Sequence, residues 1–214
     1  MPSMALEFCL FLRPTHADTI ASWTFENCYQ TNAVTGTDSS GLLPALGPAG
    51  SLAWGHHASA ASAFSDVAGK SSAHALTADH WAIGDFFEFQ TATLGFTDIS
   101  VSFDQYRSGT GPTNWDFEYS MNGSDFIVLT NGFYALDTAS SWRSLSFDLT
   151  SATELADNAN VYFRIYADSA PSSTAGASRV DNFIVLGQPV PEPTIIALSV
   201  VGGLTCVIAT RRKR

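Results

Sequence analysis

The stretch 160–168, "NVYFRIYAD", shows the pattern that decides the fold class. Three apolar residues alternate with three amphipathic ones: Val161, Phe163 and Ile165 against Tyr162, Arg164 and Tyr166. Side chains of a β-strand point to opposite faces in turn, so a period of two predicts one buried and one solvent-facing side. The stretch is therefore predicted to be a half-buried antiparallel strand.

The same period recurs in "DISVSFDQY" (98–106), "NWDFEYS" (114–120) and "SLSFDL" (144–149). Asn122-Gly123 predicts a hairpin turn after the second of these. Residues 31–64, rich in Gly, Ala, Ser and Pro, indicate long loops with short edge strands, and "SATELADNA" (151–159) indicates one short helical turn. The expected fold is all-β: an antiparallel two-sheet jelly-roll-like sandwich of about eight to eleven short strands.

The composition fits an exported all-β domain. The chain has 214 residues, of which only 14% are charged and 12% are aromatic, with a net charge of -10. Four of the ten Lys and Arg residues are the last four of the chain, so the body is strongly acidic and is expected to repel nucleic acid. Of the three cysteines, Cys9, Cys28 and Cys206, only Cys28 lies in the body, so no disulfide is expected there.

The chain ends in "VPEPTIIALSVVGGLTCVIATRRKR" (190–214). Residues 194–210 carry no charge, and as a helix they would span about 25 Å, nearly the thickness of a bilayer core. The cations that follow predict a cytoplasmic end and a body outside the inner membrane; they are Arg211, Arg212, Lys213 and Arg214. Residues 1–17 are predicted as a signal peptide, cleaved after Ala17. No basic residue precedes its apolar stretch, so the reading frame is hypothesised to begin further upstream.

A Pro-Glu-Pro motif, an apolar span containing glycine and an Arg-rich end, in this order, resemble the PEP-CTERM sorting signal of exosortase substrates. The resemblance covers residues 188–214, with the motif at Val190, Pro191, Glu192 and Pro193. It implies a Gram-negative bacterium, export, recognition of the motif by a membrane transpeptidase of the exosortase class, and delivery to the cell surface or the exopolysaccharide matrix. The alternative is a plain C-terminal membrane anchor that retains the body at the membrane.

The body, residues 18–187, resembles the β-sandwich of carbohydrate-binding modules. The matching segments are "ASWTFE" (21–26) as first strand, "WDFEYSMNGSDF" (115–126) as central hairpin and "SRVDNFIVLG" (178–187) as last strand, with "LGQPV" (186–190) as linker. The resemblance implies that the first and last strands lie together and that Glu26 and Asp181 hold a structural Ca²⁺. The alternative is that Glu26 is a solvated strand end and that Asp181 binds backbone amides.

Sugar binding requires exposed aromatic rings flanked by polar groups. Tyr162 and Tyr166, on the predicted outer face, are the candidates; the other exposed-ring options are Trp54, Trp81, Trp115, Trp142 and Tyr106. Asp116 and Glu118 share a strand face, as a glycosidase pair would. No GxSxG, P-loop, CxxC or HExxH motif is present, and His56-His57, His74 and His80 lack metal-site spacing. The sequence therefore predicts a non-catalytic surface protein that binds polysaccharide, with a glycan hydrolase or lyase as the alternative.

Overall fold

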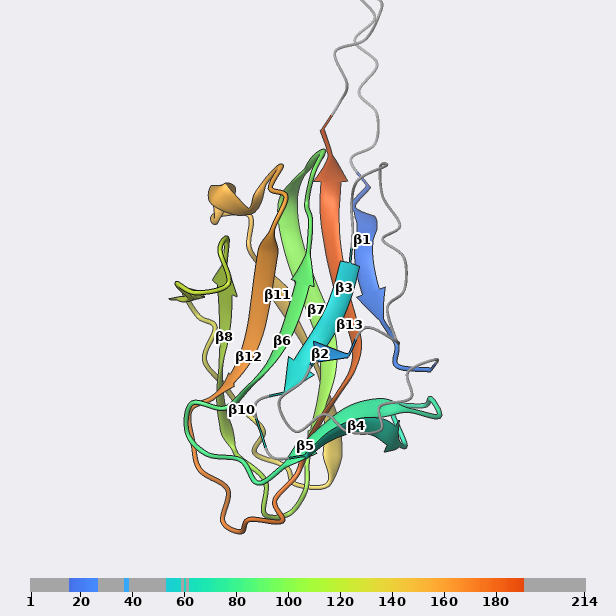
Figure 1. Ribbon diagram of the computed structural model, residues 1–214, viewed down its shortest axis with the longest axis vertical. Helices are drawn as coiled ribbons and strands as arrows, with labels where there is room; N and C mark the ends of the chain where they lie inside the picture. Colours follow the sequence, from blue (N-terminus) through green and yellow to red (C-terminus); the bar gives the residue numbers. More distant parts are fainter. Residues whose placement is uncertain (1–15, 27–36, 39–52, 59, 61, 191–214) are drawn as a thin grey trace, which may run out of the picture.

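The computed structural model describes residues 16–26, 37–38, 53–58, 60 and 62–190. Within them every strand pairing is antiparallel, and the only helical element is a 3-10 turn, Thr153–Leu155 (η1). Two sheets face each other in a sandwich (Figure 1). The predicted all-β class and two-sheet architecture are thus confirmed for the described part of the chain. The short helical turn is also where the sequence places it.

The first sheet, called sheet A, has the order β11-β7-β13-β5-β4, and β1 pairs with β13 beside β5. Its strands are β1 (Asp18–Trp23), β4 (Ser62–Val67), β5 (Ala75–Asp79), β7 (Phe96–Arg107), β11 (Ser141–Asp148) and β13 (Ser178–Pro189). The first and last strands of the body are therefore neighbours, as expected. The last strand continues through residue 189, where it pairs with Phe96, so the predicted linker belongs largely to the sheet.

The second sheet, called sheet B, has the order β10-β8-β12-β6-β3-β2, and β9 also pairs with β8. Its strands are β2 (Thr37–Asp38), β3 (Ala53–Ala58), β6 (Phe86–Thr91), β8 (Asn114–Ser120), β9 (Ile127–Val128), β10 (Tyr134–Ala135) and β12 (Val161–Ala167). The described chain has thirteen strands, more than the eight to eleven expected. Three of them, β2, β9 and β10, have only two residues and carry too short a pattern to be read from sequence.

Aromatic rings fill the space between the sheets. Phe183 of β13 stacks on Phe89 of β6 with centroids 3.7 Å apart, and Phe117 of β8 stacks on Phe147 of β11 at 4.5 Å. Each pair joins one sheet to the other, and all four rings are buried. Each such ring pair stabilises the fold by about 0.5–1.5 kcal/mol beyond the free energy gained from burying the rings. This core holds the two sheets together through hydrophobic and ring–ring contacts.

The two ends of the body lie at the same end of the sandwich. Asp18 is opposite Gly187 in the β1–β13 pairing, and Figure 1 shows the start of β1 and the end of β13 side by side. The other end of the sandwich carries the residues around Ser178 and Arg107, which pair with each other. This second end is called the distal end below. Within the described residues no helix is long and apolar enough to cross a membrane; the predicted span, 194–210, lies outside them.

Candidate functional site

The outer face of sheet B carries the two tyrosines that the sequence singles out. In β12 the buried residues alternate with partly exposed ones, so Tyr162 and Tyr166 do point away from the core. The β8–β12–β6 register places three rows side by side on this face: Ser120–Tyr162–Gln90, Glu118–Arg164–Glu88 and Asp116–Tyr166–Phe86. The tyrosines are four residues apart, about 13 Å along the strand. The two rings lie in line on this face with hydrogen-bonding groups around them, and this pair is called the platform below.

Tyr162 is held in place from two sides. Its hydroxyl accepts a hydrogen bond of 2.8 Å from Gln90 Nε2 of the neighbouring strand. Its ring lies against the β8–β9 turn at Gly123, where a Cβ atom would come within 3.0 Å of the ring. Gly123 also has φ +72°, a conformation that glycine adopts without strain. The predicted turn thus has a second role, because it supports the first ring of the platform.

Arg164 lies between the two tyrosines and makes one ion pair and two ring contacts. Its Nε is 2.7 Å from Glu88 Oε2. Its guanidinium lies 3.8 Å from the centroid of the Phe86 ring and 3.5 Å from that of Phe126, so it is sandwiched between two aromatic rings. Such a cation–π pair adds about 0.5–2 kcal/mol to stability. Arg164 therefore fixes the β8–β9 loop, which contributes Phe126, over the middle of the face.

Carboxylates dominate the rest of this face. Burial raises the pKa of Asp116, and the nearby Asp168 raises it further. Burial also raises the pKa of Glu118; Arg164 opposes this shift, and Asp116 adds to it. Glu118 is 8% exposed and accepts no hydrogen bond from the described residues. The prediction that Asp116 and Glu118 share a face is confirmed by the β8–β12 register, and burial disfavours the charged form of both.

The other aromatic candidates divide into core and surface. Trp81 and Trp115 are 4% and 0% exposed and contact each other at 5.1 Å between centroids, so they belong to the core and cannot bind a ligand. The side chain of Trp54 lies outside the described residues. Trp142 and Tyr106 remain, and both are partly exposed on the outer face of sheet A.

On sheet A these two rings form a row with an arginine. Trp142, Tyr106 and Arg179 are directly opposite one another across β11, β7 and β13. The Trp142 and Tyr106 ring centroids are 5.5 Å apart, and the guanidinium carbon of Arg179 is 4.8 Å from the Tyr106 centroid. Sequence reasoning did not find this row, because it depends on the register between three strands that are far apart in the chain.

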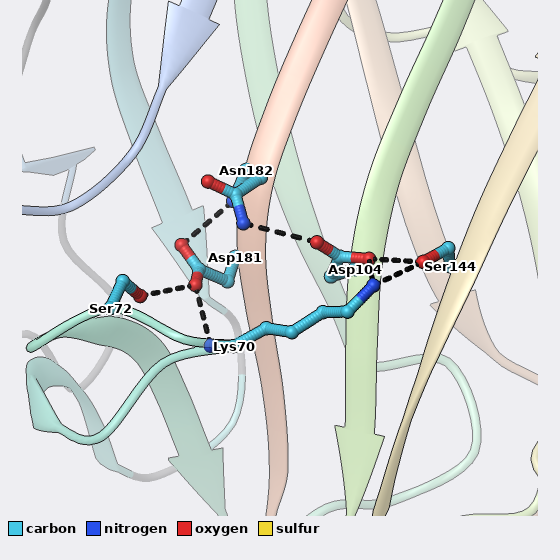
Figure 2. A network of polar contacts seen from close by, with 6 residues as sticks. All are labelled: Lys70, Ser72, Asp104, Ser144, Asp181 and Asn182. Carbon is cyan, nitrogen blue, oxygen red and sulfur yellow. Dashed lines mark hydrogen bonds and ion pairs between the residues drawn. The ribbon is translucent and has the colours of Figure 1, made fainter.

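Glu26 and Asp181, the predicted calcium ligands, both bind the loop between β4 and β5. Glu26 accepts hydrogen bonds from the backbone N–H groups of His74 (3.0 Å) and Ala73 (3.3 Å). Asp181 is fully buried, and Figure 2 shows its carboxylate facing the same loop. Its Oδ2 accepts hydrogen bonds from Lys70 N (2.8 Å) and Ser72 Oγ (2.7 Å), and its Oδ1 accepts one from its neighbour's backbone N–H.

These contacts match the amide-binding alternative. Burial raises the pKa of Asp181 despite its three donors, while the His74 N–H lowers the pKa of Glu26. N–H donors present positive charge to the same oxygens that a cation would need. No group of three or more His, Cys, Asp or Glu side chains that could hold a metal is found among the described residues. The calcium site stays a prediction, without support from these contacts.

The same loop is tied to the outer face of sheet A by Lys70. Its Nζ is 2.7 Å from Asp104 Oδ1 and also donates to Ser144 Oγ, while Asn182 Nδ2 donates to Asp104 Oδ2 at 3.0 Å (Figure 2). Burial alone would raise the pKa of Asp104, but the donors Lys70, Ser144 and Asn182 outweigh it and lower that pKa. Asn182 has φ +50° and lies at a bulge in β13. This network binds four segments of the chain into one unit.

The histidines and the sorting motif are the remaining candidates, and only part of them lies within the described residues. The ring of His80 contacts Asp79 through Nδ1 at 2.8 Å, and the His74 backbone binds Glu26; the His56 and His57 side chains are not among those described. Val190, the first residue of the sorting motif, is exposed, and its N–H donates to Gly95 O at 2.8 Å. The rest of the motif and the basic tail lie beyond the described residues.

Neither protein-family models nor curated proteins match the chain. Solved structures do. The CBM22-1 xylan-binding domain of Paenibacillus barcinonensis Xyn10C has 11% identity and a TM-score of 0.46, with 82% of this chain and 99% of that one covered. The xylan-binding module CBM15 has 13% identity and a TM-score of 0.47, with 64% of this chain and 95% of that one covered. The K1 cleaved adhesin domain of Lys-gingipain from Porphyromonas gingivalis W83 has 16% identity and a TM-score of 0.45, with 77% of this chain and 95% of that one covered. At these values the likeness is one of general β-sandwich outline and carries no argument about ligands.

Proposed function

We propose that this chain is an exported, non-catalytic β-sandwich protein that binds polysaccharide at the cell surface or in the extracellular matrix. The observation that carries the proposal is the outer face of sheet B, where Tyr162 and Tyr166 lie in line among hydrogen-bonding side chains. Rings of this kind stack on pyranose rings, and polar groups at their edges bind the hydroxyls. The carboxylates beside them favour a polymer that carries no negative charge.

Affinity electrophoresis in gels containing neutral polysaccharides, such as xylan and β-glucan, tests this function. We expect retardation of the full chain, and at least a tenfold weaker affinity for Tyr166→Ala and Tyr162→Ala. Phe133→Ala is the matched control, since Phe133 is an aromatic residue that is 56% exposed and lies outside the three rows. Equal retardation of all variants would contradict this binding face.

The same incubation separates binding from catalysis. The alternative, a hydrolase or lyase, would use Asp116 and Glu118, whose pKa values are raised and which share the face with the tyrosines. An enzyme would release new reducing ends or unsaturated products, and a binding protein would not. Loss of product in Glu118→Gln together with retained binding would establish the enzyme.

The proposal includes sorting by an exosortase-type transpeptidase. The supporting features are the Val190–Pro193 motif, the uncharged span 194–210 and the basic end 211–214. Mass spectrometry of the mature protein reports both processed ends, and we expect a new C-terminus near the motif. A chain that keeps residues 194–214 and stays equally membrane-bound in cells with and without the sorting enzyme would instead be a plain membrane anchor.

A further inference from the structure

The distal part of the described body contains cations without carboxylate partners, which is unusual in so acidic a body. Between Asp18 and Val190 there are only five Lys and Arg residues. Lys70 and Arg164 form ion pairs with Asp104 and Glu88. The other three, Arg107, Arg143 and Arg179, have no carboxylate within 4.0 Å among the described residues, although carboxylates greatly outnumber them.

These three arginines are held by backbone carbonyls instead. Arg107 donates to Leu136 O and Asp137 O, Arg143 to Ala135 O, and Arg179 to Ala68 O. The Nε of Arg179 is buried and has no hydrogen-bond partner among the described residues. A carbonyl positions a guanidinium but leaves its positive charge uncompensated. The arrangement therefore keeps positive charge available at one edge of the molecule.

Aromatic rings and a hollow adjoin this charge. The Trp142–Tyr106–Arg179 row spans three adjacent strands, about 10 Å by strand spacing. Trp142 also lines a surface hollow of about 300 Å³ together with Asp137, Thr138, Ser141 and Arg143. That volume is at the lower end of the range for small-molecule sites. The Trp142 ring, two hydroxyl side chains and the Arg143 guanidinium thus border one open space, and Arg179 lies at the other end of the aromatic row.

We infer that the Trp142–Tyr106–Arg179 row and the adjoining hollow form a second glycan site, which binds an acidic polysaccharide through its sugar carboxylates. The rings of Trp142 and Tyr106 stack on the sugar chain, and Arg179 binds a sugar carboxylate at the Tyr106 end of the row, for which the fork of the guanidinium is well matched. Arg143 binds a second carboxylate where the hollow adjoins Trp142.

This site is separate from the platform on sheet B, because it lies on the outer face of the opposite sheet. The two faces also differ in charge, since carboxylates surround the tyrosines and arginines border the tryptophan. A chain with both sites joins an acidic polymer to a neutral one. The row lies at the distal end, near the Ser178–Arg107 pairing, away from the end at which both termini of the body leave.

The test is affinity electrophoresis of the full chain in gels containing polygalacturonate or alginate. We expect retardation that decreases as salt is raised, and loss of this salt-sensitive retardation in fully methyl-esterified polygalacturonate, which lacks the charge. Trp142→Ala and Arg179→Gln should each weaken affinity at least tenfold, whereas Phe133→Ala should have no effect. Arg179→Lys should recover only part of the loss, because a lysine cannot bind a carboxylate in two-pronged fashion.

The outcomes are distinct. No retardation by either polyuronate, equal retardation of Trp142→Ala and wild type, or retardation only by single-stranded DNA would overturn the inference. Trp142 lies on the edge strand β11, where a substitution disturbs the fold less than in the middle of the sheet. The Trp142→Ala variant therefore tests the site even if the Arg179→Gln variant does not fold. Retained binding of Trp142→Ala to neutral polysaccharide shows that the sheet B platform is independent. If the platform fails its own test, the polyuronate result still stands by itself.

Discussion

Asp181→Ala is expected to detach the β4–β5 loop from the sheet and to lower the free energy of unfolding substantially. The carboxylate is 0% exposed and accepts hydrogen bonds from Lys70 N, Ser72 Oγ and Asn182 N. A hydrogen bond to a charged group contributes about 1.5–3 kcal/mol, and the two bonds to the loop are lost outright. Burial of the carboxylate offsets part of this gain, as its raised pKa shows.

The net loss should be about 2–4 kcal/mol after that offset. For a body of this size this corresponds to a decrease in Tm of roughly 4–16 °C. Urea unfolding followed by tryptophan fluorescence measures the change, with an unaltered m-value expected. Asp137→Ala is the matched control, since Asp137 is an exposed carboxylate. A loss no greater than that of the control would refute the reasoning, because it would mean that the loop is held by other contacts.

Three further outcomes are expected. Burial raises the pKa of Asp116, Glu118 and Asp181, so the folded state binds protons more readily than the unfolded state, and Tm should rise as pH falls from 7 towards the ordinary carboxyl values. The pKa of Asp104 is lowered instead, so Tm should fall again as pH decreases below 3.8 and this carboxylate becomes protonated. A Tm that only decreases with falling pH would contradict this prediction. Gly123→Ala should cost about 1–2 kcal/mol and weaken neutral-polysaccharide binding, because φ is +72° and the new Cβ would press on the tyrosine ring, as unfolding and gel retardation will show. EDTA should leave Tm unchanged in differential scanning fluorimetry, because N–H donors face both predicted calcium ligands; a decrease reversed by Ca²⁺ would restore the calcium site.

The period of two in the sequence was sufficient to place most strands and their buried faces. Phe163 and Ile165 are 0% exposed, and Ile99 and Val101 are 1% exposed, as alternation predicts. The reason is that a sandwich strand has one neighbour sheet, so hydrophobicity alone sets its orientation. The end of β13 was missed because Gly187, Gln188 and Pro189 carry no such pattern; the pairing with β7 and the N–H of Val190 extend the sheet there instead.

The candidate sites show where this reasoning ends. Tyr162 and Tyr166 could be assigned to the outer face because both lie on one strand with a clear pattern. The Trp142–Tyr106–Arg179 row could not, because it requires the β11–β7–β13 register, which is set by long-range pairing. Alternation predicts the face of a side chain but not its neighbours on the next strand. Only the structure shows that an arginine with no carboxylate within 4.0 Å among the described residues lies beside the Tyr106 ring and continues the row from Trp142.

The placement of Asp181 suggests why the last strand and the β4–β5 loop are joined so firmly. Gly69 of this loop has no room for a Cβ atom, which would lie 2.4 Å from Asp181 Oδ2. The loop also carries Lys70 to Asp104, on the strand that contributes Tyr106 to the aromatic row. A loop that is fixed on both sides keeps β7 and β13 in register where Arg179 meets Tyr106. The buried polar network therefore serves the second site as a positioning device, so Gly69→Ala should weaken polyuronate binding while leaving the neutral-polysaccharide platform on the opposite sheet intact.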